Sequence, residues 1–198
     1  MSRSDQAAPE VEAAEFPVLH RIRIKGRASE QELSAFVTEP GRLASLDEAG
    51  YVARTRVGFL LTEAGLARHD ALLADERART DRAAVETSYE RFQRVNPVVK
   101  ATCARWHTAH ELWEKWDAIG ALADQLGRVD GALRRVAEVL PRFDGYRTGL
   151  AGALERAEAG HEQYVVDPTL PSFHTLWFEC HEDYLLTLGR TREEEGSY

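Results

Sequence analysis

The sequence of 198 residues contains no run of about 18 apolar residues, the length that a membrane-spanning helix needs. It has two cysteines, Cys103 and Cys180, and no Cys-x-x-Cys pair that would indicate a zinc or dithiol redox site. Both cysteines fall in apolar, aromatic sequence, so we expect buried free thiols, as in a cytoplasmic protein. Residues 1–16 lack the apolar core of a signal peptide, and their acidic composition predicts a disordered lead-in.

The net charge of −8 is unusual for a protein that binds nucleic acid. The charge is unevenly distributed, because residues 20–56 contain seven Lys or Arg against five Asp or Glu, a local balance of +2. The acidic excess therefore belongs to the rest of the chain. Charge alone permits DNA binding by this segment without indicating it.

Residues 17–69 have the order of elements of a winged helix-turn-helix domain. A first helix is expected over 17–26, although the alternation of Ile22 and Ile24 would also fit a strand. Ser29 is a suitable cap for a second helix with apolar residues at helical spacing, and Pro40 ends that helix. A short third helix follows, and the β-forming residues of 51–62 predict a hairpin, the wing.

In such a domain one helix enters the major groove of DNA and the wing reaches the phosphates. We expect Arg42 and Ser45, on the short third helix, to contact base edges. Arg54 and Arg56, in the wing, are expected to contact phosphate. The alternative is that the same domain serves as a platform for protein interaction or dimerisation.

The second domain, expected over 70–190, is predicted to be almost wholly helical. One long helical segment is expected over 63–94, and Pro97 is expected to begin the next helix. Between 122 and 140, apolar residues recur at steps of four and three, which predicts an amphipathic helix. A further helix is expected over 146–159.

A final helix is expected from a cap at Ser172 to about Leu188, closed by Gly189. These helices are enough for a small bundle. The predicted fold class is therefore mainly α with a small β-wing, a winged helix-turn-helix domain followed by an α-helical bundle domain. Residues 191–198 are expected to form a disordered tail.

Tryptophan and histidine concentrate in residues 103–116 and 172–184. On the final helix His174 and His181 fall on the half expected to pack inward, where an imidazole needs a hydrogen-bond partner. The two histidines are about 10 Å apart along the helix, too far to share a metal ion directly. We expect no metal or cofactor, and three alternatives stay open: satisfied core histidines, an acid–base site, and a ligand pocket.

Of the two functional alternatives, we favour the pocket over the acid–base site, for a small and partly apolar ligand. Bulky aromatic side chains leave crevices in a bundle, and histidine and carboxylate groups would bind the polar end of the ligand. We expect the pocket between the helix that follows Asn96-Pro97 and the final helix. The expected ligand-binding residues are Trp106, His110, His174, Trp177, Glu179 and His181.

Over most of residues 17–190 the chain resembles an actinobacterial group of winged helix-turn-helix proteins, the MarR-like transcriptional regulators. Similar sequences also accompany pyruvate phosphate dikinase-like proteins. The segment Ser172-Phe173-His174-Thr175-Leu176-Trp177-Phe178-Glu179-Cys180-His181-Glu182-Asp183 is the most specific carrier of this resemblance. The other carriers are Leu46-Asp47-Glu48-Ala49-Gly50-Tyr51-Val52, Leu61-Thr62-Glu63-Ala64-Gly65, Tyr89-Glu90-Arg91-Phe92, Cys103-Ala104-Arg105-Trp106 and Leu140-Pro141-Arg142-Phe143.

The resemblance and the residue patterns together predict a cytoplasmic transcriptional regulator. Two copies, held together by residues 63–94, would bind DNA through their winged domains, and the helical domain would sense a small-molecule effector. Compared with the resembled group, the interval between Leu33 and Leu46 is short, which leaves a small recognition helix. The alternative is therefore an accessory module, without DNA binding, of a phosphoenolpyruvate-utilising or biosynthetic enzyme. A small enzyme that uses a His/carboxylate pocket ranks third.

Overall fold

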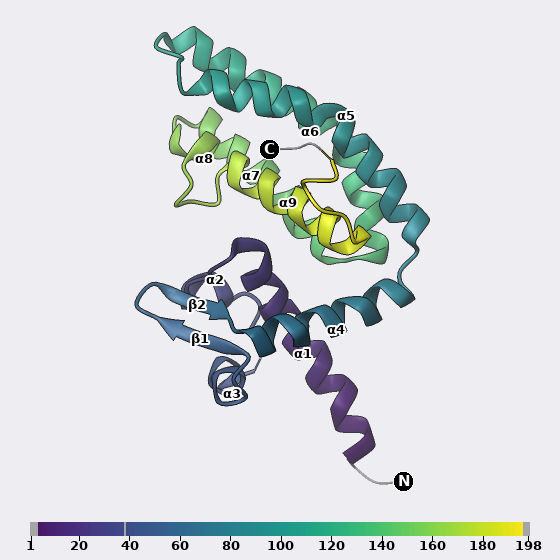
Figure 1. Cartoon of the computed structure of the whole chain (residues 1–198). Coiled ribbons are helices and arrows are strands. Elements are labelled where there is room, and N and C mark those ends of the chain that lie inside the picture. Colours follow the sequence, from purple (N-terminus) through teal and green to yellow (C-terminus); the bar gives the residue numbers. More distant parts are fainter. Residues whose placement is uncertain (1–3, 38, 196–198) are drawn as a thin grey trace. The chain divides into compact units, whose positions relative to one another are not determined.

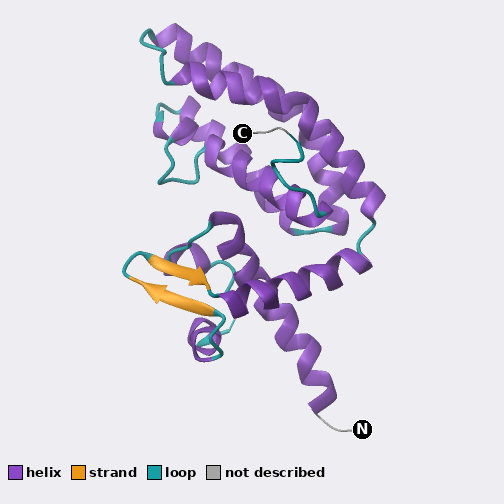
Figure 2. Ribbon diagram, viewed as in Figure 1, coloured by secondary structure: helices purple, strands orange, loops and turns teal. Residues whose placement is uncertain are grey.

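The computed structural model describes residues 4–37 and 39–195, with side chains from Ala14 onward. The chain is mainly helical with one small antiparallel sheet, which confirms the expectation at this level (Figure 1 and Figure 2). It divides into two compact units, residues 1–79 and residues 80–198, which are described separately below. None of the helices in the described residues combines the length and apolarity needed to cross a membrane.

The first unit contains four helices and a hairpin of two strands in its described part. The elements are α1 (Ser4–Lys25), α2 (Glu30–Leu33), α3 (Arg42–Glu48), β1 (Val52–Thr55), β2 (Gly58–Leu61) and α4 (Glu63–Arg79). The predicted disordered lead-in over 1–16 is wrong from Ser4 onward, because α1 begins there; residues 1–3 lie outside the described residues. Ala and Glu dominate this stretch, and both are strong helix formers.

Local signals start α2 as predicted. The Ser29 hydroxyl accepts a hydrogen bond from the backbone N–H of Glu32, and the Glu32 carboxylate accepts one from the backbone N–H of Ser29. This reciprocal capping box satisfies two backbone donors at the helix start. Helix α3 begins after Gly41, which has the left-handed φ of 82° that glycine tolerates best.

The hairpin of the first unit is extended by a third, very short extended segment. Strands β1 and β2 pair in antiparallel register, with Val52 opposite Leu61. Ala28 then pairs with the outer edge of β2 through two backbone hydrogen bonds with Phe59, of 3.1 and 2.8 Å. A side chain at Gly58 would meet the carbonyl oxygen of Ala28 at 2.4 Å, so this pairing depends on glycine.

The core of the first unit lies between the hairpin and the helices. Its buried apolar residues come from α1, the Ala28 segment, α2, α3, the hairpin and α4. They are Val18, Leu19, Ile22, Ala28, Leu33, Leu46, Val52, Phe59 and Leu72.

In the described part of the second unit, every regular element is a helix. Its helices are α5 (Arg82–Trp106), α6 (Leu112–Val139), α7 (Arg142–Glu158), α8 (Gln163–Val166) and α9 (Phe173–Leu188). Helices α5 and α6 form a long antiparallel pair, and α7 and α9 pack against that pair and each other (Figure 1). The boundary between the units follows Arg79, ten residues beyond the predicted one, because α4 continues to that point.

Two predicted helix boundaries in this region are wrong. The expected continuous segment over 63–94 is broken at Asp81, whose carboxylate caps α5 by accepting from the backbone N–H groups of Ala83 and Ala84. Pro97 does not begin a helix, since α5 continues through it to Trp106. Buried residues on both sides of Pro97, including Val95 and Val99, stabilise the helix against the loss of one backbone hydrogen bond.

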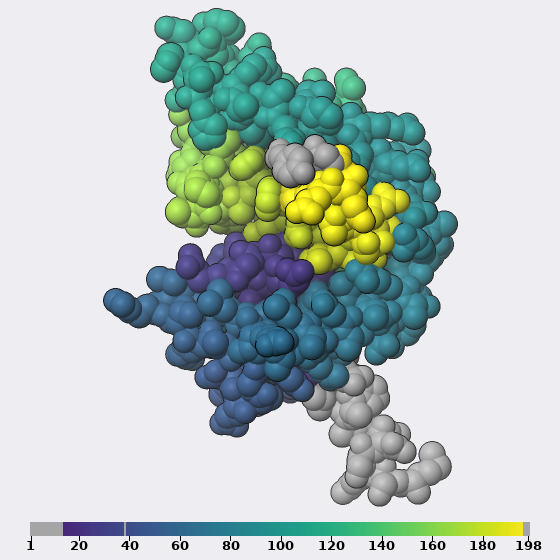
Figure 3. Space-filling model, in the orientation of Figure 1, coloured from purple at the N-terminus to yellow at the C-terminus, as the bar shows by residue number. Residues whose placement is uncertain are grey.

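The limits of α9 agree with the prediction. The Ser172 hydroxyl accepts from the backbone N–H of Thr175, and Gly189 ends the helix with a left-handed φ of 69°. The predicted disordered tail is wrong for residues 191–195, which turn back along α9, while 196–198 lie outside the described residues. In Figure 3 the yellow residues after α9 lie on the surface of this unit beside the teal residues of α5.

Candidate functional site

A cavity of about 180 Å³ lies between α5 and α9 in the second unit. Its lining combines three apolar side chains with amide, imidazole and cationic groups. The lining residues are Asn96, Val99, Lys100, His174, Trp177, Phe178, His181 and Arg192.

One wall of the cavity is fixed by Trp177. This side chain is buried, and its indole N–H donates to the Asn96 side-chain oxygen at 3.0 Å. Its ring also stacks on Phe92, with 4.2 Å between ring centroids. A buried indole with a satisfied N–H and a stacked neighbour makes a rigid apolar surface.

His181 connects the cavity to a carboxylate that three side chains bind. The Nε2 atom of His181 lies 3.2 Å from Oε2 of Glu195, and the Gln93 side-chain amide donates to the same oxygen at 2.8 Å. The Tyr89 hydroxyl donates to the other oxygen of Glu195. Only 12% of the Glu195 side chain is exposed, so these donors replace most of its water. We call Tyr89, Gln93 and His181 the carboxylate receptor.

The ionisation states suit the receptor. Burial lowers the pKa of His181, and the nearby Arg192 adds to this effect while Glu195 opposes it. Burial raises the pKa of Tyr89 well above its usual value, and the hydrogen bond to Glu195 and the negative charge of that carboxylate add to the shift. At neutral pH the tyrosine is therefore a hydroxyl donor, and a neutral imidazole donates through Nε2–H.

Three of the predicted ligand-binding residues line the cavity: His174, Trp177 and His181. The prediction that both histidines face inward is wrong for His174, which is exposed, whereas His181 is buried. His174 shares its edge of α9 with the half-exposed Phe178, four residues later. Its pKa is lowered by desolvation and secondarily by the neighbouring His107.

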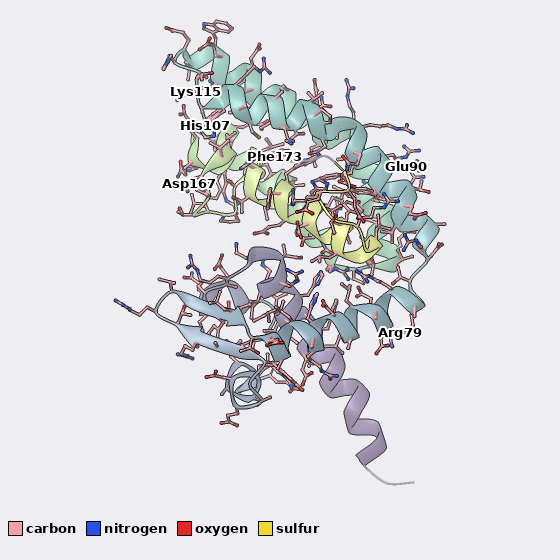
Figure 4. The ribbon with its side chains drawn as sticks, viewed as in Figure 1. Arg79, Glu90, His107, Lys115, Asp167 and Phe173 are labelled. Carbon is pink, nitrogen blue, oxygen red and sulfur yellow. The ribbon has the colours of Figure 1, made fainter. Side chains whose placement is uncertain are left out.

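The other three predicted ligand-binding residues lie away from this cavity. Trp106 is buried at the end of α5, with the Lys115 ammonium 5.7 Å from the centre of its ring. His110 is exposed in the loop before α6, and Figure 4 shows His107 and Lys115 at this end of the α5–α6 pair. Glu179 is buried on α9 but does not line the cavity.

The residues predicted to bind DNA lie in the first unit and differ in how far their side chains are exposed to solvent. Arg42 forms an ion pair with Glu39 and leaves 10% of its side chain exposed. Ser45 is exposed on α3, and its hydroxyl donates to the Gly41 carbonyl at 3.2 Å.

The hairpin arginines are more open than Arg42. Arg54 is exposed, packs over the Phe59 ring at 4.9 Å and lies 3.6 Å from Glu30. Arg56 is exposed at the turn between β1 and β2. Arg54, Arg56 and Ser45 are therefore available for an external partner, whereas Arg42 is mostly covered.

The sequence prediction missed Tyr89, Gln93 and Glu195. Tyr89 and Gln93 are four residues apart on one helix, so the sequence could have predicted that their side chains are neighbours on one face. Glu195 lies more than 100 residues further along the chain, and patterns of neighbouring residues cannot predict a contact over that separation.

No group of three or more His, Cys, Asp or Glu side chains is placed to hold a metal ion within residues 14–37 and 39–195. Comparisons of the chain with protein-family models, with curated proteins and with solved structures found no match.

Proposed function

We propose that the chain is a transcriptional regulator that binds DNA through residues 1–79 and senses a small-molecule effector through its helical unit. The observation that carries the proposal is the order of elements in the first unit. Helix α1, the paired segment at Ala28, α2, α3 and the β1–β2 hairpin follow one another as in a winged helix-turn-helix. We propose that α3 meets the major groove and the hairpin is the wing.

The side chains favour a division of roles within this interface. Arg54 and Arg56 are exposed cations on the hairpin, suited to phosphate contacts. Ser45 is exposed on α3 and can reach a base edge. Arg42 would have to break its pair with Glu39 before contacting DNA, so it contributes less than the sequence predicted.

A helix as short as α3, with seven residues, offers few base contacts. We therefore propose that two copies bind as a homodimer, so that two weak half-site contacts add. The proposed dimer interface is the segment 63–94, which comprises α4 and the first half of α5.

Electrophoretic mobility shifts of the full chain on the DNA upstream of its own gene test this function. We expect binding that weakens steeply as salt rises, because phosphate contacts release counterions. The double variant Arg54→Ala/Arg56→Ala should bind more weakly and lower the slope of log affinity against log salt by roughly two. Arg134→Ala, an exposed arginine on α6, is the matched control and should change neither. Undetectable or salt-independent binding would contradict the proposal.

One observation favours the accessory module as the second candidate. Trp113 and Trp116, at the start of α6, are 66% and 48% exposed. Exposed tryptophans of this kind are typical of protein interfaces. A partner enzyme that co-purifies with the native chain but not with Trp113→Ser/Trp116→Ser, with no DNA shift for either, would favour this candidate.

A further inference from the structure

We propose that the carboxylate receptor is the polar half of the effector site and that Glu195 occupies it in place of the effector. The ligand class is a small monocarboxylate with a flat apolar body, such as an aromatic acid. Its carboxylate would displace Glu195 from Tyr89, Gln93 and His181, and its body would enter the neighbouring cavity. This inference rests on the effector-sensing part of the proposed function.

The receptor has the chemistry of a carboxylate-binding site. Three donors from two helices converge on the two oxygens of one carboxylate, Tyr89 on Oε1 and Gln93 and His181 on Oε2. The Tyr89 hydroxyl also accepts a hydrogen bond from Gln93, which orients it toward the carboxylate. Tyr89 and His181 are buried, so the donors are held in place before any ligand arrives.

The cavity next to the receptor has the size and surface for an aromatic body. His181 belongs to both, so a carboxylate in the receptor directs its substituent toward Trp177. Val99, Trp177 and Phe178 supply the apolar surface. The volume of about 180 Å³ exceeds the roughly 150 Å³ that holds benzene in an engineered protein cavity.

Apart from the contacts of Glu195 itself, ion pairs of Arg190 and Arg192 hold the segment that carries this residue. Arg192 donates to Glu182 at 2.8 Å and lies 3.9 Å over the Phe178 ring, which borders the cavity. Arg190 lies 3.6 Å from Glu86, and both of these side chains are partly exposed. Partly exposed ion pairs contribute little stability, so exchange of one carboxylate for another can release residues 190–195.

Calorimetric titration of the full chain with benzoate tests the proposal, with benzamide as the uncharged probe of the same shape. We expect benzoate to bind at least tenfold more tightly than benzamide. Glu195→Ala removes the internal competitor and should raise benzoate affinity about tenfold or more. Glu193→Ala removes the same charge from an exposed position two residues away and should leave the affinity unchanged. Gln93→Ala should weaken benzoate binding in both backgrounds.

Limited digestion with trypsin reports the release of the tail. Cleavage after Arg192 should accelerate when benzoate is added, and in Glu195→Ala without ligand. Circular dichroism checks that each variant is folded, and Glu195→Gln provides a variant of unchanged shape.

Unchanged or weaker benzoate binding by Glu195→Ala and Glu195→Gln would overturn the proposal, as would tryptic cleavage that benzoate does not affect. Neither measurement uses DNA. Failure of the mobility-shift experiment would therefore overturn DNA binding and leave the ligand site standing.

Discussion

His20 and His69 share a hydrogen bond inside residues 1–79, with 3.0 Å between Nδ1 of His20 and Nε2 of His69. The two rings are nearly parallel, at 12°, and both are buried. The Asp70 carboxylate lies 3.0 Å from Nδ1 of His69, so that nitrogen carries the proton and Nε2 accepts from His20. The arrangement therefore requires a neutral His69.

We predict that this unit loses stability in mild acid. Burial, with a smaller contribution from His20, lowers the pKa of His69 from 6.5 to about 4, and Asp70 only partly opposes the shift. As the pH falls from 6.5 toward 4, the unfolded chain binds a proton that the folded chain does not. The free energy of unfolding should fall by roughly 3 kcal/mol over this range.

Denaturant unfolding at pH 7 and pH 4.5 measures this effect. His69→Gln is expected to be less stable than the native chain at pH 7 but to lose less stability in acid. His161→Gln, which changes an exposed histidine, should keep the native pH dependence. An equal acid loss in His69→Gln would show that other groups cause it.

The buried pair of Arg142 and Asp183 predicts a large loss of stability when one partner is removed. Asp183 is fully buried and accepts from Nε of Arg142 at 2.9 and 3.0 Å and from the Tyr146 hydroxyl at 3.1 Å. Arg142→Met leaves the carboxylate without its cation and should lower the free energy of unfolding by about 3–5 kcal/mol.

A matched substitution on α6 is the control for this prediction. Arg134, which is 66% exposed, pairs with Asp130 at 2.7 Å, and Arg134→Met should cost less than about 1 kcal/mol. Equal effects of the two substitutions in thermal unfolding would mean that Arg142 contributes no more than a surface pair.

Neither cysteine is expected to react in the folded protein. Burial raises the pKa of the Cys103 thiol to about 11 and that of Cys180 well above its usual value. Because the thiolate is the reactive form, a colorimetric disulfide reagent at pH 8 should label neither thiol in native protein and both in guanidinium chloride. Rapid labelling of either one without denaturant would show that its helix opens readily.

Two glycine-to-alanine substitutions should change the free energy of unfolding in opposite directions. A side chain at Gly65 in α4 would lie 1.8 Å from the carbonyl oxygen of Tyr51, so Gly65→Ala should lower the free energy of unfolding by about 1–3 kcal/mol or more. Gly127 in α6 has open space around it, and Gly127→Ala should raise stability by about 0.5–1 kcal/mol. Melting temperatures of the two variants check this, and a stable Gly65→Ala would mean that the backbones there separate easily.

Sequence patterns predicted the features that depend on neighbouring residues. The cap at Ser29, the hairpin, and the limits of α9 at Ser172 and Gly189 all follow from contacts within a few positions. The prediction that Pro97 begins a helix was wrong because burial of the residues around it outweighs the loss of one backbone hydrogen bond. The opposite error, one continuous segment over 63–94, arose because the Asp81 cap gives a weak signal in charged sequence.

Only the part of the candidate site that depends on spacing within one helix could be predicted from the sequence. Trp177 and His181 could be found from their spacing on a single helix. Trp106 was wrongly assigned to the pocket, because helical spacing does not show which turns of α5 pack against α9. Glu195 could not be found at all, since its partners come from α5 and α9 and its own segment was expected to be disordered.

The proline inside α5 also affects the mechanics of the helix that carries the receptor. Pro97 has no N–H to donate to the carbonyl of Gln93, four residues earlier. One backbone hydrogen bond of α5 is therefore missing at Gln93, which belongs to the carboxylate receptor. Two stiff halves of α5 therefore meet at a compliant joint there. A bend at this joint would change the distance between the Gln93 amide and α9, so binding of a ligand in the proposed receptor would depend on the curvature of α5.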